Sequence, residues 1–156
     1  METLTCCFSG HRKLPQNKID SIIKHLNAEI ETLIHQGVKK FISGGALGFD
    51  LMAASLIVSK KEMGADIRLI FMLPCRNQEE LWSDDEKRLY RSLINEADEI
   101  IYVSEDFYSG CMKKRNYAMV ERADICICAL LHKMSGTSQT VDYARRRGMK
   151  IINIAN

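Results

Sequence analysis

With 156 residues, of which 46% are hydrophobic and 27% charged, the chain has the composition of one globular domain spanning residues 1–156 and not of a disordered segment. Its formal net charge of +2 is too small to predict a nucleic-acid partner, and no apolar run approaches the roughly 20 residues that a membrane-spanning helix needs. The sequence shows neither a signal peptide nor cysteines at metal-binding spacing, so we expect a cytoplasmic protein with no metal and no resident cofactor.

Six β-rich runs alternate with five helical stretches along the chain. The expected strands are Leu4–Ser9, Lys39–Ser43, Ile67–Leu73, Glu99–Val103, Asp124–Leu130 and Lys150–Ile154. Most are apolar nearly throughout, which is typical of strands whose two faces are both covered. The strict alternation predicts an α/β, Rossmann-like, doubly wound fold, with a mainly parallel sheet of about six strands and helices on both faces.

The helices differ in their apolar patterns. Apolar residues of the first recur at helical spacing, and we expect Pro15 to open it and Gly37 to cap its end. The second, about Ala46–Met63, is apolar nearly all round between Leu51 and Val58. Such a helix is buried on more than one side, against the sheet and, if the protein is a homodimer, against a second copy. Further helices are expected near Ser83–Glu96, Cys111–Arg122 and Ser138–Arg147.

Glycine, hydroxyl and basic residues follow the predicted strands at one edge of the sheet. The segments are Ser9–Lys13 after the first strand, Ser43–Asp50 after the second, Pro74–Gln78 after the third and Ser135–Ser138 after the fifth. In open α/β sheets, ligands bind beyond the carboxyl ends of the strands. The pattern therefore predicts a site for a phosphate-bearing small molecule, namely a nucleotide or a nucleotide derivative.

The segment Gly44-Gly45-Ala46-Leu47-Gly48-Phe49-Asp50 carries the strongest signal. Glycines let a backbone approach an anion closely, and free amides at a following helix start bind phosphate. The spacing fits neither the dinucleotide fingerprint nor the P-loop, and the glycines could serve a tight turn alone. Two interpretations of Asp50 stay open: a structural acid that suits the helix dipole, or an acceptor for ribose hydroxyls.

Basic residues near the same edge favour an anionic ligand. His11 and Arg12 follow the first strand directly, and we expect Arg12 to clamp a phosphate or carboxylate, with a surface role as the alternative. Lys113-Lys114-Arg115 lie early in the fourth helix, where the dipole disfavours positive charge. That placement is more readily explained if one of the three faces an anion. His132 lies in a loop, and its position indicates no function.

Together these motifs resemble the SLOG superfamily, which groups the DNA-processing protein A domain with the LOG-type lysine-decarboxylase-like proteins, and most closely its YpsA-type branch. The resemblance covers nearly the whole chain and rests first on Ser9-Gly10-His11-Arg12 and on Ser43–Asp50. Arg115-Asn116 and Gly136-Thr137 with Thr140 add to it. The expected ligand-binding residues are Ser9, Gly10, His11, Arg12, Gly44, Gly45, Gly48, Asp50, Pro74, Arg115, Asn116, Gly136 and Thr137.

For LOG-type relatives, the resemblance also implies a hydrolase that releases a base from a nucleoside monophosphate. That chemistry uses an arginine in the fourth helix, which Arg115 matches, and a glutamate at a position where this chain has Thr140. Threonine can hydrogen-bond but cannot act as a base near neutral pH. Asp50 or Asp142 would then supply the acid, although a helix turns Asp142 to nearly the opposite face from Thr140.

Three functions stay open. The leading one is binding of a nucleotide or an ADP-ribose-like derivative without catalysis. The second is hydrolysis of a nucleotide's N-glycosidic bond, with Arg115 holding phosphate. The third is single-stranded DNA binding, against which the near-neutral charge and the lack of an evident aromatic and basic groove both argue. Phe49, Trp82 and Tyr108 could stack on a base, although such aromatic residues more often pack under a loop.

Overall fold

The structure is a computed structural model and describes residues 3–155. Within that range the chain forms β1 (Leu4–Gly10), α1 (Ile19–His35), β2 (Val38–Ser43), α2 (Phe49–Glu62), β3 (Arg68–Leu73), α3 (Asp84–Asn95), β4 (Glu99–Tyr102), α4 (Cys111–Glu121), β5 (Ile125–Ala129), α5 (Gly136–Arg146) and β6 (Lys150–Asn153). The strands form one sheet in the order β4-β3-β2-β1-β5-β6, and every neighbouring pair is parallel. This is the Rossmann-like, doubly wound α/β fold that the alternating pattern predicts.

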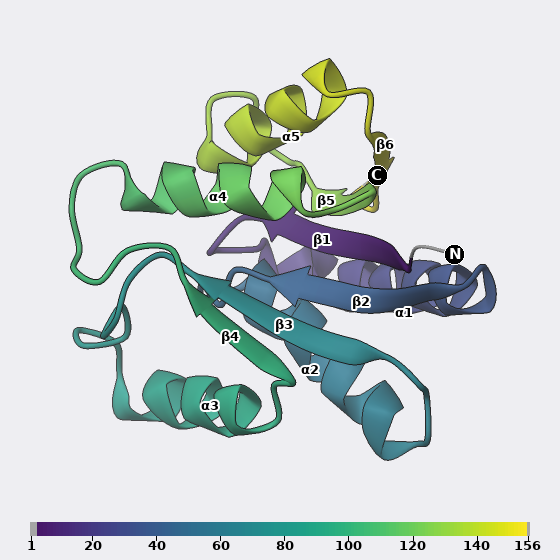
Figure 1. The fold of residues 1–156 in the computed structure, drawn as a ribbon, viewed down its shortest axis with the longest axis horizontal. Coiled ribbons are helices and arrows are strands. Elements are labelled where there is room, and N and C mark those ends of the chain that lie inside the picture. The colour runs from purple at the N-terminus through teal and green to yellow at the C-terminus, as the bar shows by residue number, and fades with distance from the viewer. Residues whose placement is uncertain (1–2, 156) are drawn as a thin grey trace.

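Two apolar cores cover the two faces of the sheet (Figure 1). On one face, α1, α2 and α3 bury residues such as Leu26, Ile57 and Leu93 against the strands. On the other, α4 and α5 bury Met119 and Val141. Successive residues of a strand point to opposite faces, so strands that are apolar throughout supply both cores.

The chain reverses its direction of travel across the sheet at β1. From β1 it adds β2, β3 and β4 in turn on one side, and it then crosses back to place β5 and β6 on the other side. The connections that leave β1 and β5 therefore diverge, and they leave a crevice at the carboxyl ends of these two neighbouring strands. This is the topological switch point at which open α/β sheets bind their ligands.

Helix α2 is buried within the chain itself. Its inner side lies on the sheet, its flanks meet α1 and α3, and Phe49, Ala53, Ala54 and Ile57 have no exposed surface. Most of the apolar pattern of this helix is thus buried without a second copy, while Met52, Leu56 and Val58 stay partly exposed, and the homodimer stays a prediction.

Helix starts differ from the sequence expectation by a few residues. Helix α2 begins at Phe49 and not near Ala46, because Gly48, with φ +81°, interrupts the helical path just before it. Helix α5 begins at Gly136, two residues earlier than predicted, because the Ser135 hydroxyl accepts the Ser138 amide at 3.1 Å and caps the helix there. Pro15 leads into a short 3-10 turn, Gln16–Lys18, ahead of α1.

Candidate functional site

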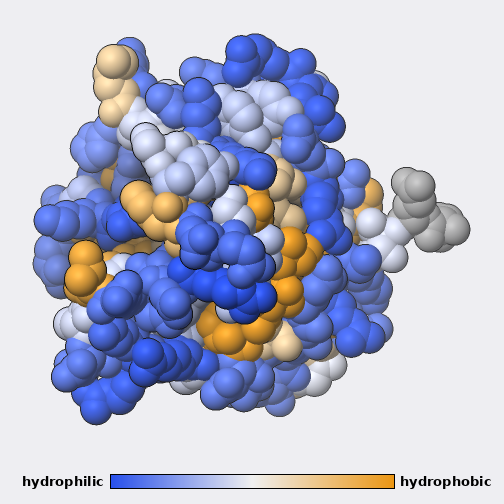
Figure 2. All heavy atoms as spheres, turned by 60° about the vertical axis from the view of Figure 1, so that its left-hand side comes forward, coloured by the Kyte–Doolittle hydropathy of each residue, from blue (hydrophilic) through white to orange (hydrophobic). Residues whose placement is uncertain are grey.

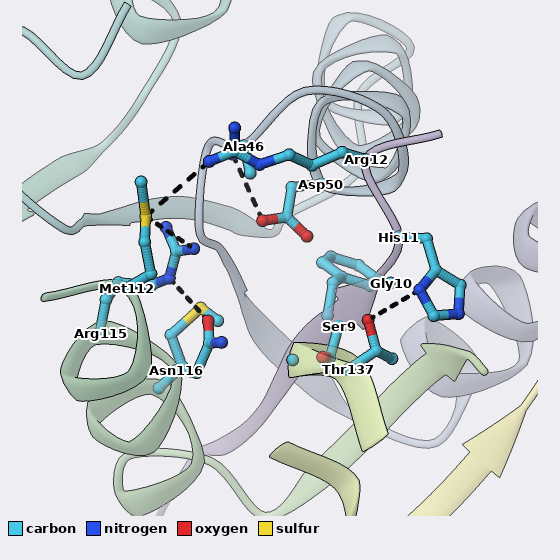
Figure 3. A pocket seen from close by; sticks show the side chains of 13 residues that line it. Ser9, Gly10, His11, Arg12, Ala46, Asp50, Met112, Arg115, Asn116 and Thr137 are labelled. Atoms are coloured by element: carbon cyan, nitrogen blue, oxygen red, sulfur yellow. Dashed lines mark hydrogen bonds between the residues drawn. The ribbon is translucent and has the colours of Figure 1, made fainter. Parts of the chain in front are cut away.

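A cavity of about 260 Å³ lies at the switch point (Figure 3). It is lined by Phe8, Ser9, Gly10, His11 and Arg12 at the end of β1, by Ala46 in the turn before α2 and Asp50 in its first turn, by Met112, Arg115, Asn116 and Met119 of α4, and by Gly136 and Thr137 of α5. Figure 2 turns this edge of the sheet toward the viewer and shows a mainly hydrophilic surface with separate apolar groups. Four segments of the chain therefore meet around one hollow, whose wall is partly polar and partly apolar.

The structure brings most of the predicted site residues to this cavity but not all of them. Gly44, Gly45, Gly48 and Pro74 do not line it. Gly44, Gly45 and Pro74 are buried in the turns that follow β2 and β3.

Glycine at two of the predicted positions is required by packing. A side-chain carbon at Gly48 would overlap the Arg12 carbonyl, and one at Gly10 would overlap the Phe49 ring. The Phe49 amide donates to the His11 carbonyl at 3.2 Å, which ties the start of α2 to the end of β1. These glycines allow the two segments to touch.

In the glycine turn, residues 43–50, two backbone amides already donate hydrogen bonds to side chains of the same turn. The Gly45 amide donates to the Ser43 hydroxyl at 3.2 Å, and the Ala46 amide donates to an oxygen of Asp50 at 3.3 Å. The Ser43 hydroxyl in turn donates to the Asp50 carbonyl at 2.9 Å. The carboxylate of Asp50 thus occupies part of the anion cradle that the glycine pattern suggests, and presents its remaining acceptor capacity to the cavity.

Asp50 is 5% exposed, and its burial raises the pKa of the carboxyl from 3.8 to about 6. Arg115, the Ala46 amide and Arg12 oppose the rise, because each stabilises the ionised form. The carboxyl therefore titrates close to neutral pH. Perturbed groups of this kind in a cavity are typical of functional sites, although buried ion pairs also produce them.

Arg115 is the residue of the basic run in α4 that faces an anion. It is 4% exposed, donates to the Gly44 carbonyl, and places Nε 2.8 Å from the Asn116 side-chain oxygen. Burial lowers the pKa of this guanidinium, and the Asp50 charge opposes that effect. Lys113 and Lys114 are exposed. The chain itself thus supplies one anion for Arg115.

Arg12 and Arg115 converge on the same side of the cavity. Each guanidinium lies 3.9 Å from the sulfur of Met112 (Figure 3). A thioether is a weak acceptor, so this contact uses little of the hydrogen-bonding capacity of either group. Arg12 is otherwise exposed. Two cations face a hollow that contains one carboxyl, and the balance of charge favours an anionic ligand.

His11 connects the end of β1 to the loop between β5 and α5. The Leu131 amide donates to its Nε2 at 2.9 Å, and its Nδ1 lies 3.5 Å from the Thr137 hydroxyl. Its ring lies 4.7 Å from that of His132, centre to centre. Burial, and after it His132, lowers the pKa of His11. Sequence reasoning missed His132, since no spacing rule links a loop residue to one that precedes it by more than a hundred positions.

The roles predicted for Asp142, Phe49 and Trp82 do not fit the geometry. Asp142 is exposed on α5, 3.8 Å from Arg145 and outside the cavity lining, so it cannot replace a carboxylate at Thr140. Thr140 is buried and donates its hydroxyl to the Gly136 carbonyl at 2.9 Å. Phe49 is fully buried against Phe8, and Trp82 packs edge-on against Tyr90, so neither ring offers a face to a base in the cavity.

Residues 3–155 contain no group of three or more His, Cys, Asp or Glu side chains that could hold a metal ion. All six cysteines are buried and free. In the same range, none of the helices has both the length and the apolar character needed to cross a membrane.

Comparisons with known proteins agree with this architecture. A family model described as the YspA SLOG family matches residues 9–151. The SPbeta prophage-derived protein YoqJ of Bacillus subtilis (strain 168) is 34% identical over an alignment of 134 positions, and the match covers 78% of each chain. A UPF0398 protein of Bacillus cereus (strain B4264) is 24% identical over 133 residues, covering 83% of this chain and 72% of the relative.

Two solved structures share the fold at low sequence identity. DNA processing protein A of Streptococcus pneumoniae matches 96% of this chain with a TM-score of 0.70 and 17% identity. DNA processing protein A of Helicobacter pylori matches 95% with a TM-score of 0.65 and 18% identity. The present chain spans 49% of the first of these proteins and 63% of the second. At this identity the likeness concerns the fold.

Proposed function

Because the chain belongs to the YpsA family of the SLOG superfamily, we propose that its cavity binds a nucleotide or a nucleotide-derived ribose phosphate, such as an ADP-ribose-like molecule. The observation that carries the proposal is the convergence of Arg12, Arg115, Asp50 and the first turn of α5 on one hollow at the switch point of the sheet.

Each part of such a ligand has a complementary group. The amides of Gly136 and Thr137 lie in the first turn of α5, where no carbonyl of the helix can accept them, and they suit a phosphate together with Arg12. The carboxyl of Asp50 suits ribose hydroxyls, because it can accept hydrogen bonds from them. Arg115 attracts that carboxyl through its charge and adds positive charge to the cavity.

The cavity volume favours the ribose phosphate as the enclosed part. At about 260 Å³ the hollow is below the roughly 300–1,000 Å³ of pockets that enclose drug-sized molecules. A nucleotide would therefore place its sugar and phosphate inside and its base toward the open mouth. We expect affinity to depend more on the phosphate and the sugar than on the identity of the base.

Calorimetry and thermal unfolding with AMP, ADP-ribose, adenosine and inorganic phosphate test the proposal. A ligand at about 100 times its Kd stabilises the folded protein by roughly 2.7 kcal/mol. We expect this from the phosphate-bearing probes, a large loss in Arg12→Ala, and little change in the exposed neighbour Lys13→Ala. If none of the phosphate-bearing probes raises the unfolding temperature, the proposal is wrong.

The burial of Asp50 beside Arg115 favours a second candidate, hydrolysis of a nucleotide's N-glycosidic bond. A carboxyl with a pKa of about 6 can act as an acid or base near neutral pH. Incubation with nucleoside monophosphates should then release free base, and Asp50→Asn should abolish the release while Thr140→Val leaves it intact. Release that survives Asp50→Asn would exclude Asp50 from the chemistry.

Single-stranded DNA is a third candidate, since DNA processing protein A of Helicobacter pylori, which shares the fold, is described as binding it. Arg12, Lys13 and His11 would be the contacts at the carboxyl edge of this chain. Fluorescence anisotropy with a labelled oligonucleotide tests it, because binding to a phosphate backbone weakens steeply with added salt. Oligonucleotide affinity that is unchanged in Arg12→Ala would remove the cavity edge as the DNA site.

A further inference from the structure

We propose that His11 is a positioning residue whose hydrogen bonds fix the Thr137 hydroxyl as a donor to the anionic group of the ligand. The proposal rests on the proposed function of the same cavity and names how one wall of it recognises negative charge. His11 lines the cavity, and its ring is turned toward Thr137 in the first turn of α5 (Figure 3).

The tautomer of His11 follows from its backbone partner. A backbone N–H can only donate, and the Leu131 amide lies 2.9 Å from Nε2. Nε2 must therefore be the unprotonated acceptor nitrogen, which places the single proton of the neutral ring on Nδ1. The fold, through the position of Leu131, thus selects one of the two neutral forms of the ring.

The same tautomer determines what Thr137 can do. Nδ1 lies 3.5 Å from the Thr137 hydroxyl oxygen, a long contact in which the ring N–H is the donor and the oxygen the acceptor. The hydroxyl proton then cannot point back at His11. Thr137 lines the cavity in the first turn of α5, so its proton is free to be donated to a ligand oxygen, beside the Thr137 amide.

The charged and titratable groups around His11 come from four segments. His132 lies beside it, with the two rings tilted, in the loop after β5, and Arg12 follows it in the chain. Asp50 faces the same cavity from α2, and Arg115 does so from α4. Burial and His132 both disfavour a positive ring. His11 therefore stays neutral around pH 7, and acidification would place a proton on Nε2 against the Leu131 amide.

A purely structural histidine would behave differently. If His11 only anchors the loop, its replacement lowers stability but does not change the affinity for negatively charged probes beyond that for neutral ones. If it orients Thr137, the loss concerns anionic probes, and it disappears once the Thr137 hydroxyl is gone. The two cases are separated by combining substitutions at both positions.

The first measurement needs no ligand. Long-range proton–nitrogen correlation spectra of the four histidines distinguish the two neutral tautomers of each ring. We expect the His11 ring, assigned by its loss in His11→Asn, to carry its proton on Nδ1 at pH 7.5. A neutral ring protonated on Nε2 overturns the proposed positioning of Thr137 by His11, whatever the protein binds.

The second measurement is a double-mutant cycle with AMP as the anionic probe and adenosine as the neutral control. We expect Thr137→Val and His11→Ala each to weaken AMP binding by about tenfold, as for loss of one hydrogen bond to a charged group. The double variant should be no weaker than Thr137→Val alone. Adenosine binding should change little in any of them.

Two conservative variants complete the cycle. Thr137→Ser keeps the hydroxyl, and His11→Asn keeps an N–H donor near the position of Nδ1, so both should retain most of the AMP affinity. The positioning role of His11 is overturned if the effects of His11→Ala and Thr137→Val simply add, or if they are equal for AMP and adenosine. Either result leaves the proposed function standing. If the wild-type chain shows the expected tautomer but does not bind AMP, the proposed function is wrong. The role of His11 in ligand binding is then wrong with it.

Discussion

At the scale of single residues, the cavity is defined by charges that the chain buries. Asp50 and Arg115 are each about one-twentieth exposed. Burial raises the pKa of Asp50 and lowers the pKa of Arg115, and both shifts favour the neutral form of the group. Their mutual attraction opposes the shifts without removing them. Such a pair costs stability that a well-packed apolar pair would not, and its place in the wall of the cavity is consistent with the proposed ligand binding.

The raised pKa of Asp50 has a measurable effect on stability. Folding raises it from 3.8 to about 6, so between these values the folded state binds protons more tightly than the unfolded state. The free energy of unfolding therefore loses this contribution as pH rises from about 4 to about 6. Asn does not titrate, so the wild-type value minus the Asp50→Asn value should fall over that range, by up to about 3 kcal/mol.

Urea unfolding of both proteins at several pH values measures this difference. In this difference, the contributions of His11 and of every other group that titrates alike in the two proteins cancel. It also removes the constant cost of leaving Arg115 without its carboxylate. A difference that stays flat between pH 4 and pH 7 would mean that Asp50 is ionised in the folded protein throughout.

Gly48 provides a second test at the residue scale. Gly48 and Gly64 both have positive φ, +81° and +100°. A Cβ added at Gly48 would overlap the Arg12 carbonyl, whereas a Cβ added at Gly64 would point into open space. Gly64→Ala should cost about 1–2 kcal/mol for backbone strain alone. Gly48→Ala should cost clearly more, because α2 must move away from the end of β1. Chemical denaturation compares them, and equal costs would contradict the close approach.

At the scale of elements, the start of α5 connects stability with binding. Ser135 caps this helix through the Ser138 amide, and the first turn that it orders lines the cavity. Helix α3 has a comparable cap at Ser83, whose own amide also donates to the Glu86 carboxylate, but it lies outside the cavity lining. The two serine hydroxyls therefore make the same cap bond, and only the one at Ser135 orders a turn that lines the cavity.

Ser135→Ala and Ser83→Ala should each lower stability by about 0.5–2 kcal/mol. Only Ser135→Ala should also weaken AMP binding, because the first-turn amides of α5 lose their fixed direction. Calorimetry at a temperature where both variants are fully folded separates the two effects. An AMP affinity that is unchanged in Ser135→Ala would show that α5 does not contribute its N-terminus to the ligand.

At the scale of the whole molecule, one sheet separates two cores and contributes side chains to both. Loss of either helical layer exposes strands that the other layer also needs. We therefore expect residues 1–156 to unfold as one cooperative unit, in keeping with the single domain that length and composition predict.

The single tryptophan makes this testable. Trp82 packs against Tyr90 at the periphery of the core formed by α1, α2 and α3, so its fluorescence reports that layer, whereas far-ultraviolet circular dichroism reports all helices. The two signals should give the same urea midpoint. A tryptophan transition that clearly precedes the loss of helix would indicate that the region around α3 unfolds separately.

The sequence by itself determined the fold class, since continuous apolar strands, amphipathic helices and short glycine turns are local patterns that the alternation of elements arranges in one way. It also identified most of the residues that meet at the switch point, because carboxyl ends of parallel strands share an edge. Only the tertiary structure decided which of them face the cavity. It bonds the Ala46 amide to Asp50, leaves Gly44 and Gly45 out of the cavity lining, exposes Asp142 on α5, and places the His11 ring beside that of His132. These outcomes depend on contacts between segments far apart in the chain, and neither spacing nor periodicity carries information about such contacts.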